Sequence, residues 1–185
     1  MSNVAYRFIK EAFKNNGVGF GGMPALIAGS LIYPQPNNYA CGPMALRHCL
    51  LKWDVDVDLY RLIELGHVTR AGTTERQLEL MMWHAGSAFK HFDLSSAMQA
   101  KEKIDFSLNR GKALILCVEG WQHWIACLGH SRSGYLIFDS SRPGPVIKFR
   151  SWKWLRNEMR HVPKGATKAS YSIISVGRPV HWLNE

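Results

Sequence analysis

Four residues of this chain have the side chains that a cysteine-dependent acyl-transfer site requires. Cys41 supplies a thiol, Gln35 lies six residues before it, and His123 and Asp139 follow far downstream. In such a site a thiolate attacks a carbonyl carbon, an imidazole moves the proton, and a carboxylate orients the imidazole. An amide N–H can stabilise the oxyanion that forms. These four residues are therefore the candidate catalytic set.

The sequence around Cys41 predicts a helix that begins at this residue and continues to about Trp53. Gly42 and Pro43 suit the first turn of a helix, and apolar residues then recur at helical spacing. An ordinary cysteine, with a pKa of about 8.5, is only a few per cent thiolate at neutral pH. Because the amino end of a helix favours negative charge, this position favours the thiolate. A neighbouring imidazolium from His123 would favour it further.

A predicted β-hairpin brings His123 and Asp139 together across sixteen residues of sequence. Residues 123–128 and 135–139 are short apolar segments rich in β-formers. His123 opens the first strand and Asp139 closes the second. Since neighbouring antiparallel strands run in opposite directions, those two ends meet. We therefore expect Asp139 to orient the His123 ring, while the amide of Gln35 and the backbone N–H of Cys41 face the oxyanion.

The other cysteines and the histidines give no support to a metal site. Cys49, Cys117 and Cys127 lie in apolar segments, where a cysteine is more often a packing residue. The four cysteines lack both zinc-like pair spacing and the density of a disulfide scaffold, so we expect free thiols in a reducing compartment. No histidine pair has the spacing of common zinc hydrolases, and no glycine-rich phosphate loop occurs. The sequence predicts no metal and no cofactor.

Helical patterns precede strand patterns along the chain. An amphipathic helix is predicted at residues 3–15, before a connector rich in Gly, Pro and Asn at residues 16–38. Further helices are predicted at residues 41–53, from a cap at Asp58 to residue 65, from a hydroxyl cap at residues 73–74 to about residue 85, at 94–108 and at 151–160. Strands are predicted at residues 113–118, 123–128, 135–139, 146–149 and 170–176.

This order of elements predicts an α+β fold, with N-terminal helices packed on a C-terminal antiparallel sheet of about four to six strands. A chain of 185 residues is expected to form one domain. Within it, residues 1–34 hold the first helix and the connector. Residues 35–110 form a helical part with the nucleophile, and residues 111–185 form a sheet part with the histidine and the aspartate.

The net charge of +9 is concentrated toward the C-terminus, where residues from Ser140 onward have 9 Lys or Arg against 2 Asp or Glu. The basic residues of segment 148–168 are interleaved with Trp152 and Trp154, a pattern that can bind nucleic acid. The alternative, favoured because no nucleic-acid module accompanies the charge, is a solvated basic edge with both tryptophans in the core. A basic surface would also attract an acidic protein or peptide.

The N-terminal segment mixes charged residues into its apolar pattern, which is not typical of a secretory signal. The most apolar stretch, residues 18–33, is short and interrupted by Gly and Pro, which argues against a membrane span. We therefore expect a cytoplasmic protein, with delivery elsewhere by a dedicated secretion route left open.

The motifs around the four candidate residues resemble the bacteriocin-processing, double-glycine-leader peptidase family of the papain-like clan, in a stand-alone form without transporter domains. Four blocks carry the resemblance, in the family's order: Gln35 with residues 41–46, residues 72–74 with 77–78, residues 111–115 with 123–125, and residues 138–139. The resemblance implies a papain-like fold with Cys41 as nucleophile, His123 as general base and acid, Asp139 as orienter and Gln35 as oxyanion donor.

Two neighbours of these residues depart from the family pattern. The family commonly has an acidic residue before the cysteine and a proline after the late aspartate, whereas this chain has Ala40 and Ser140. The four residue types themselves are intact.

These observations favour a cysteine peptidase that hydrolyses a peptide or isopeptide bond through a thioester acyl-enzyme. If an amine replaced water as the acceptor, the same residues would make an acyltransferase or transpeptidase. A catalytically silent peptide-binding module of the same fold is the other alternative, which the retention of all four residue types disfavours. The expected partner in each case is a peptide or protein, and the sequence does not specify an oligomeric state.

Overall fold

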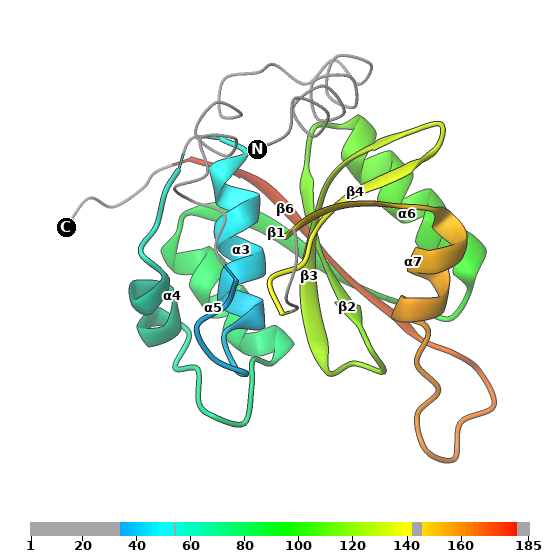
Figure 1. Cartoon of the computed structure of the whole chain (residues 1–185), viewed down its shortest axis with the longest axis horizontal. Coiled ribbons are helices and arrows are strands. Elements are labelled where there is room, and N and C mark those ends of the chain that lie inside the picture. Colours follow the sequence, from blue (N-terminus) through cyan, green and yellow to red (C-terminus); the bar gives the residue numbers. More distant parts are fainter. Residues whose placement is uncertain (1–33, 54, 142–145, 181–185) are drawn as a thin grey trace.

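The computed structural model describes residues 34–53, 55–141 and 146–180. The helix predicted at residues 3–15 and most of the connector at residues 16–38 lie outside the described residues. Within them (Figure 1), the elements follow in the order α3 (Cys41–Leu51), α4 (Leu59–Leu65), α5 (Glu75–His84), β1 (Ser87–Leu94), α6 (Ala97–Asn109), β2 (Ala113–Val118), β3 (His123–Ser131), β4 (Gly134–Phe138), β5 (Ile147–Arg150), α7 (Trp152–Met159) and β6 (Tyr171–Pro179).

The strands form one antiparallel sheet of six strands in the order β1-β6-β2-β3-β4-β5. Helices α3, α4 and α5 cover one face of this sheet, and α6 and α7 cover the other (Figure 1). Odd-numbered residues of β2 belong to the core under α3–α5, and even-numbered residues belong to the core under α6–α7. This alternation is the two-residue period of a strand that is buried on both faces. The predicted α+β architecture is confirmed.

The predicted starts of three helices coincide with observed caps. The Asp58 carboxylate accepts a hydrogen bond from the backbone N–H of Arg61 at 3.0 Å, which fixes the start of α4. Thr74 and Gln77 form a reciprocal capping box at the start of α5. At the start of α7 the Ser151 hydroxyl accepts a hydrogen bond from the backbone N–H of Trp154.

Strand β1 was not predicted, and it lies within the part expected to be helical. The predicted helix at 94–108 is instead a helix at Ala97–Asn109 that follows this strand. Among the described residues β1 pairs only with β6, so it is an edge strand. Lys90, His91 and Asp93 interrupt its apolar pattern, as is common on edges, and they obscure a strand in the sequence. The sheet therefore begins in the middle of the chain.

The described part of the chain contains no helix that combines the length and the apolar character needed to cross a membrane.

Candidate active site

The hairpin of β3 and β4 brings His123 and Asp139 into direct contact. His123 is the first residue of β3, and Asp139 follows the last residue of β4. Nε2 of His123 donates a hydrogen bond to Oδ1 of Asp139 at 2.9 Å, and both side chains are about 6% exposed. The predicted meeting of the two strand ends is thus observed.

The Asp139 carboxylate has further partners on both oxygens. Oδ1 also accepts hydrogen bonds from the backbone N–H of Ser141 at 3.2 Å and from its hydroxyl at 2.9 Å. Oδ2 accepts a hydrogen bond from Nζ of Lys148 at 2.9 Å. Burial alone would raise the pKa of Asp139, but the hydrogen bonds from His123, Lys148 and Ser141 outweigh it and hold this pKa well below its usual range. Asp139 is therefore ionised at any pH near neutrality.

The surroundings of His123 favour its protonated form. Burial lowers the pKa of this imidazole, but hydrogen bonding to Asp139 and to Cys41 outweighs burial and raises the pKa to about 9. The imidazole therefore lies between a carboxylate and a thiol, which is the arrangement that a thiolate–imidazolium pair requires.

Cys41 is the first residue of α3, as predicted, and it is 4% exposed. Close packing explains why the adjacent residue is Gly42, because a Cβ atom at this position would lie 2.5 Å from Cγ2 of Thr73. Thr73 in turn donates its hydroxyl hydrogen to the carbonyl of Tyr39 at 3.1 Å, and its own carbonyl accepts the indole N–H of Trp124 at 2.7 Å. Thr73 thus ties the start of α3 to the beginning of β3.

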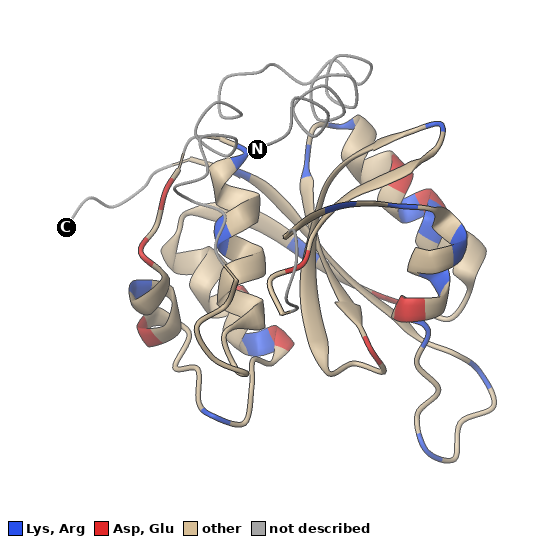
Figure 2. Cartoon of the chain, in the orientation of Figure 1, with Lys and Arg blue, Asp and Glu red and all other residues tan. Residues whose placement is uncertain are grey.

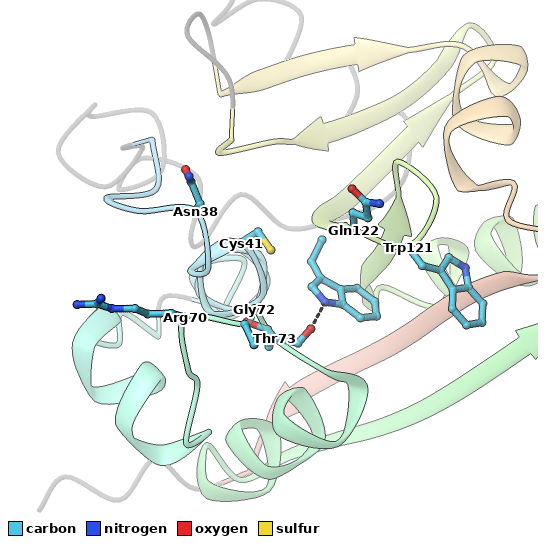
Figure 3. Close-up of a pocket in the computed structure, with 9 residues that line it drawn as sticks. Asn38, Cys41, Arg70, Gly72, Thr73, Trp121 and Gln122 are labelled. Carbon is cyan, nitrogen blue, oxygen red and sulfur yellow. Dashed lines mark hydrogen bonds between the residues drawn. The ribbon is translucent and has the colours of Figure 1, made fainter. Parts of the chain in front are cut away.

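A pocket of about 270 Å³ opens on Cys41. Its walls come from the loop before α5 and from the turn between β2 and β3, with Asn38 at a third side (Figure 3). Figure 3 shows Gly72 and Thr73 on one side of Cys41, with Gln122 and Trp121 on another. The full lining is Asn38, Cys41, Arg70, Ala71, Gly72, Thr73, Trp121, Gln122 and Trp124. A substrate that occupies this pocket reaches the thiol.

Gln35 lies beside the strand end that carries Asp139. Its backbone N–H donates to the carbonyl of Ser140 at 3.0 Å, and its side-chain Oε1 accepts the hydroxyl hydrogen of Ser140 at 3.1 Å. Because Ser140 occupies the amide oxygen, the amide N–H group is the part of the Gln35 side chain left to act as a donor. Gln35 is not among the residues that line the pocket.

The other cysteines occupy the core, as expected from the apolar segments in which they lie. Cys49, Cys117 and Cys127 are buried, and the described cysteines are all free thiols. Burial raises the pKa of the Cys127 thiol to about 12 and raises those of Cys49 and Cys117 as well. Across the described residues, no group of three or more His, Cys, Asp or Glu side chains could hold a metal ion.

The contact between Lys148 and Asp139 was not anticipated, because Lys148 was counted with the basic segment 148–168. No spacing in the sequence indicates it, since the contact depends on the register that sets Lys148 beside Ile137 of β4. Trp152 and Trp154 of the same segment pack against the core under α6 and α7, as the alternative to nucleic-acid binding requires. Figure 2 shows the remaining Lys and Arg residues of this segment on β5, on α7 and on the loop after α7. Nucleic-acid binding stays an untested prediction.

Comparison with known proteins shows the fold. No protein-family model and no curated protein matches the sequence. Among solved structures, the peptidase domain of Streptococcus ComA, a bi-functional ABC transporter of a quorum-sensing pathway, is 18% identical with a TM-score of 0.60, covering 79% of this chain and 96% of that domain. A double-glycine-motif protease from an AMS/PCAT transporter, in complex with a leader peptide, is 14% identical with a TM-score of 0.59, covering 79% and 90%.

The peptidase domain of Streptococcus mutans ComA is also similar, at 17% identity and a TM-score of 0.50, covering 78% of this chain and 97% of that one. The chain therefore has the fold of double-glycine peptidase domains, and the resemblance seen in the sequence motifs is confirmed at the level of the fold.

Proposed function

We propose that this protein is a cysteine peptidase that hydrolyses a peptide or isopeptide bond through a thioester acyl-enzyme. The observation that carries the proposal is the buried contact of His123 with Asp139 and Cys41, at the start of α3 and at an open pocket. The shared fold with peptidase domains supports it. We treat the chain as one domain, since both cores lie on one sheet.

In this mechanism the Cys41 thiolate attacks the scissile carbonyl carbon while His123 carries the proton. Collapse of the tetrahedral intermediate breaks the C–N bond, and His123 gives its proton to the departing amine. Water then attacks the thioester, with His123 as the base that accepts a proton from it. Collapse of the second tetrahedral intermediate breaks the C–S bond and releases the acid, which leaves Cys41 as the thiolate and His123 as the imidazolium. Asp139 orients the imidazole throughout and stays ionised.

The oxyanion of each intermediate would be stabilised by two N–H groups. The backbone N–H of Cys41 lies at the amino end of α3, where it has no partner within the helix. The amide N–H of Gln35 is the second donor, and the hydrogen bond from Ser140 to its oxygen supports that role. Such a donor commonly contributes about 3 kcal/mol to stabilisation of the transition state.

The pocket favours a peptide or protein substrate with an acidic group at the outer edge of the pocket, where the exposed Arg70 side chain points away from Cys41 (Figure 3). Of the described residues that line it, Arg70 alone is charged. Replacing Arg70 with Ala should lower the rate of Cys41 alkylation by anionic iodoacetate a few-fold relative to neutral iodoacetamide. Arg76→Ala is the matched control, because Arg76 is exposed on α5 and does not line the pocket. Equal rate ratios in both variants would remove the case for an acidic substrate.

Selective alkylation tests the nucleophile itself without a known substrate. Iodoacetamide labelling at pH 7, mapped by mass spectrometry to each cysteine, should modify Cys41 far faster than the three core cysteines. His123→Ala should slow the labelling of Cys41 at least ten-fold, and Cys41→Ala should abolish turnover of any peptide substrate. If Cys41 reacts no faster than Cys49, the silent binding module becomes the better hypothesis. Transfer of the acyl group to an added amine would instead identify a transferase.

A further inference from the structure

Lys148 is an unusual lysine, because its charge is largely buried against one carboxylate. It lies in β5 beside Ile137 of β4, and this register aims its side chain at the residue that follows β4. Its ammonium lies 2.9 Å from Oδ2 of Asp139, with side-chain exposures of 13% and 6%. Lysines are rarely buried to this degree unless they are paired. The two oxygens of Asp139 thus have separate cationic partners, His123 on Oδ1 and Lys148 on Oδ2.

A second positive charge on this carboxylate changes the electrostatic balance of the site. The titratable groups around it are Cys41 and His48 from α3, His123 from β3 and Lys148 from β5. His48 packs on Phe138 and is neutral, because burial lowers its pKa to about 3. With Lys148 present, the ammonium balances the carboxylate, and the imidazolium balances the thiolate. Without Lys148, the cluster would hold one uncompensated negative charge.

We propose that Lys148 is a positioning residue that acts through Asp139 and sets the pH range in which the Cys41–His123 pair is reactive. The proposal rests on the function proposed above. By sharing the carboxylate, Lys148 weakens the hold of Asp139 on the imidazolium, so that His123 releases its proton at lower pH. Its positive charge also favours the thiolate. Both effects move the pH range in which Cys41 is reactive toward acidic pH, compared with a site in which histidine alone contacts the aspartate.

The test is the pH dependence of Cys41 alkylation by iodoacetate in the full chain, mapped by mass spectrometry. With this anionic reagent the rate rises as the reactive thiolate–imidazolium pair forms and falls as the pair loses the His123 proton, so the two limbs report the two ionisations of the pair. In Lys148→Met, both limbs should move toward alkaline pH, by about one unit for the alkaline limb. Lys148→Arg should keep the wild-type profile, because the charge remains.

Lys153→Met is the matched control, because it removes the same charge from the exposed face of α7. Its profile should overlay that of the wild type. In an Asp139→Asn background, Lys148→Met should cause no further shift of the alkaline limb, because the proposed route of its effect on His123 is gone. If circular dichroism shows that Lys148→Met does not fold, the same pH profile is measured on Lys148→Gln, which removes the charge but keeps a polar side chain.

A Lys148→Met profile of lower amplitude but unchanged limbs would overturn the proposal and leave Lys148 a structural residue. A shift of the alkaline limb that persists in the Asp139→Asn background would overturn its action through Asp139. In both cases fast, His123-dependent labelling of the wild type would leave the proposed function standing. If wild-type Cys41 is labelled no faster than Cys49, the proposed function and the role of Lys148 fall together.

Discussion

Two buried histidines, His48 and His123, lie against consecutive residues at the end of β4. His123 contacts Asp139 through a hydrogen bond, whereas His48 packs its ring on Phe138 with centroids 5.2 Å apart. Neither ring nitrogen of His48 has a hydrogen-bond partner among the described residues. The pKa of His123 is raised to about 9 and that of His48 is lowered to about 3.

The difference between the two rings comes from partners and not from burial, because both are buried. Burial disfavours the imidazolium at each position, and at His48 the positive charge of nearby Arg47 lowers the pKa further. At His123 the Asp139 carboxylate and the Cys41 thiol reverse the sign of the shift. The same type of side chain is therefore an inert packing group at His48 and a candidate base at His123.

Removing the partner of His123 should have the largest effect, because it makes His123 resemble His48. We expect Asp139→Asn to lower the rate of Cys41 alkylation or peptide turnover by about 10²–10⁴-fold. Thermal unfolding should show that the variant is folded. Activity within two-fold of wild type would show that the Asp139 contact does not matter to His123.

His48 should make the protein sensitive to acid. Because its pKa in the folded state lies below its usual value of about 6.5, folding favours the neutral ring, and this stability is present above pH 6.5. It should be lost as pH falls from 6.5 toward 3, by on the order of 4 kcal/mol. Urea unfolding across this range measures the loss, and His48→Leu should flatten it. An equally steep loss in His48→Leu would assign the acid sensitivity to other groups.

His123 should have the opposite pH dependence. Its folded pKa is raised to about 9, so its stabilising contribution is fully present below pH 6.5 and is lost as pH rises through 9. We expect a decrease in the free energy of unfolding of about 3 kcal/mol across that range. His123→Gln should remove this decrease in urea titrations, whereas His48→Leu should retain it.

The smallest effect concerns His48 at neutral pH. Replacing it with Leu removes two buried nitrogens without partners among the described residues, which should raise the free energy of unfolding by about 1 kcal/mol. The pH profile of Cys41 alkylation should not change, since His48 does not contact the thiol in the proposed mechanism. A shifted profile would mean that the two histidines are coupled.

The sequence was sufficient for the features that depend on local pattern. The contact between His123 and Asp139 was predictable because a short connection between two strands makes them pair as an antiparallel hairpin, which brings these two ends together. The caps at Asp58 and Thr74 fixed helix starts through contacts within one turn. The fold class and the family resemblance followed from such segments taken in order, and the comparison with solved structures confirms the fold.

Features that depend on distant register were not predictable in this way. Strand β1 has no strong alternation, and it is a strand because β6 pairs with it from the far end of the chain. Lys148 looks like any member of a basic segment until the β4–β5 register sets it beside Asp139. His48 looks like an ordinary helix residue in the sequence, and only the packing of α3 on β4 buries its ring.

Because Gln35 is held by Ser140, the candidate site can assemble only after the later part of the chain has been synthesised. Cys41 and Gln35 leave the ribosome early, whereas His123, Asp139 and Lys148 are added about one hundred residues later. The two hydrogen bonds between Gln35 and Ser140 hold the amide donor beside the strand end that holds the aspartate. A nascent chain therefore carries a thiol with neither its base nor a positioned oxyanion donor. The proposed peptidase would become reactive only after β4 and β5 have joined the sheet.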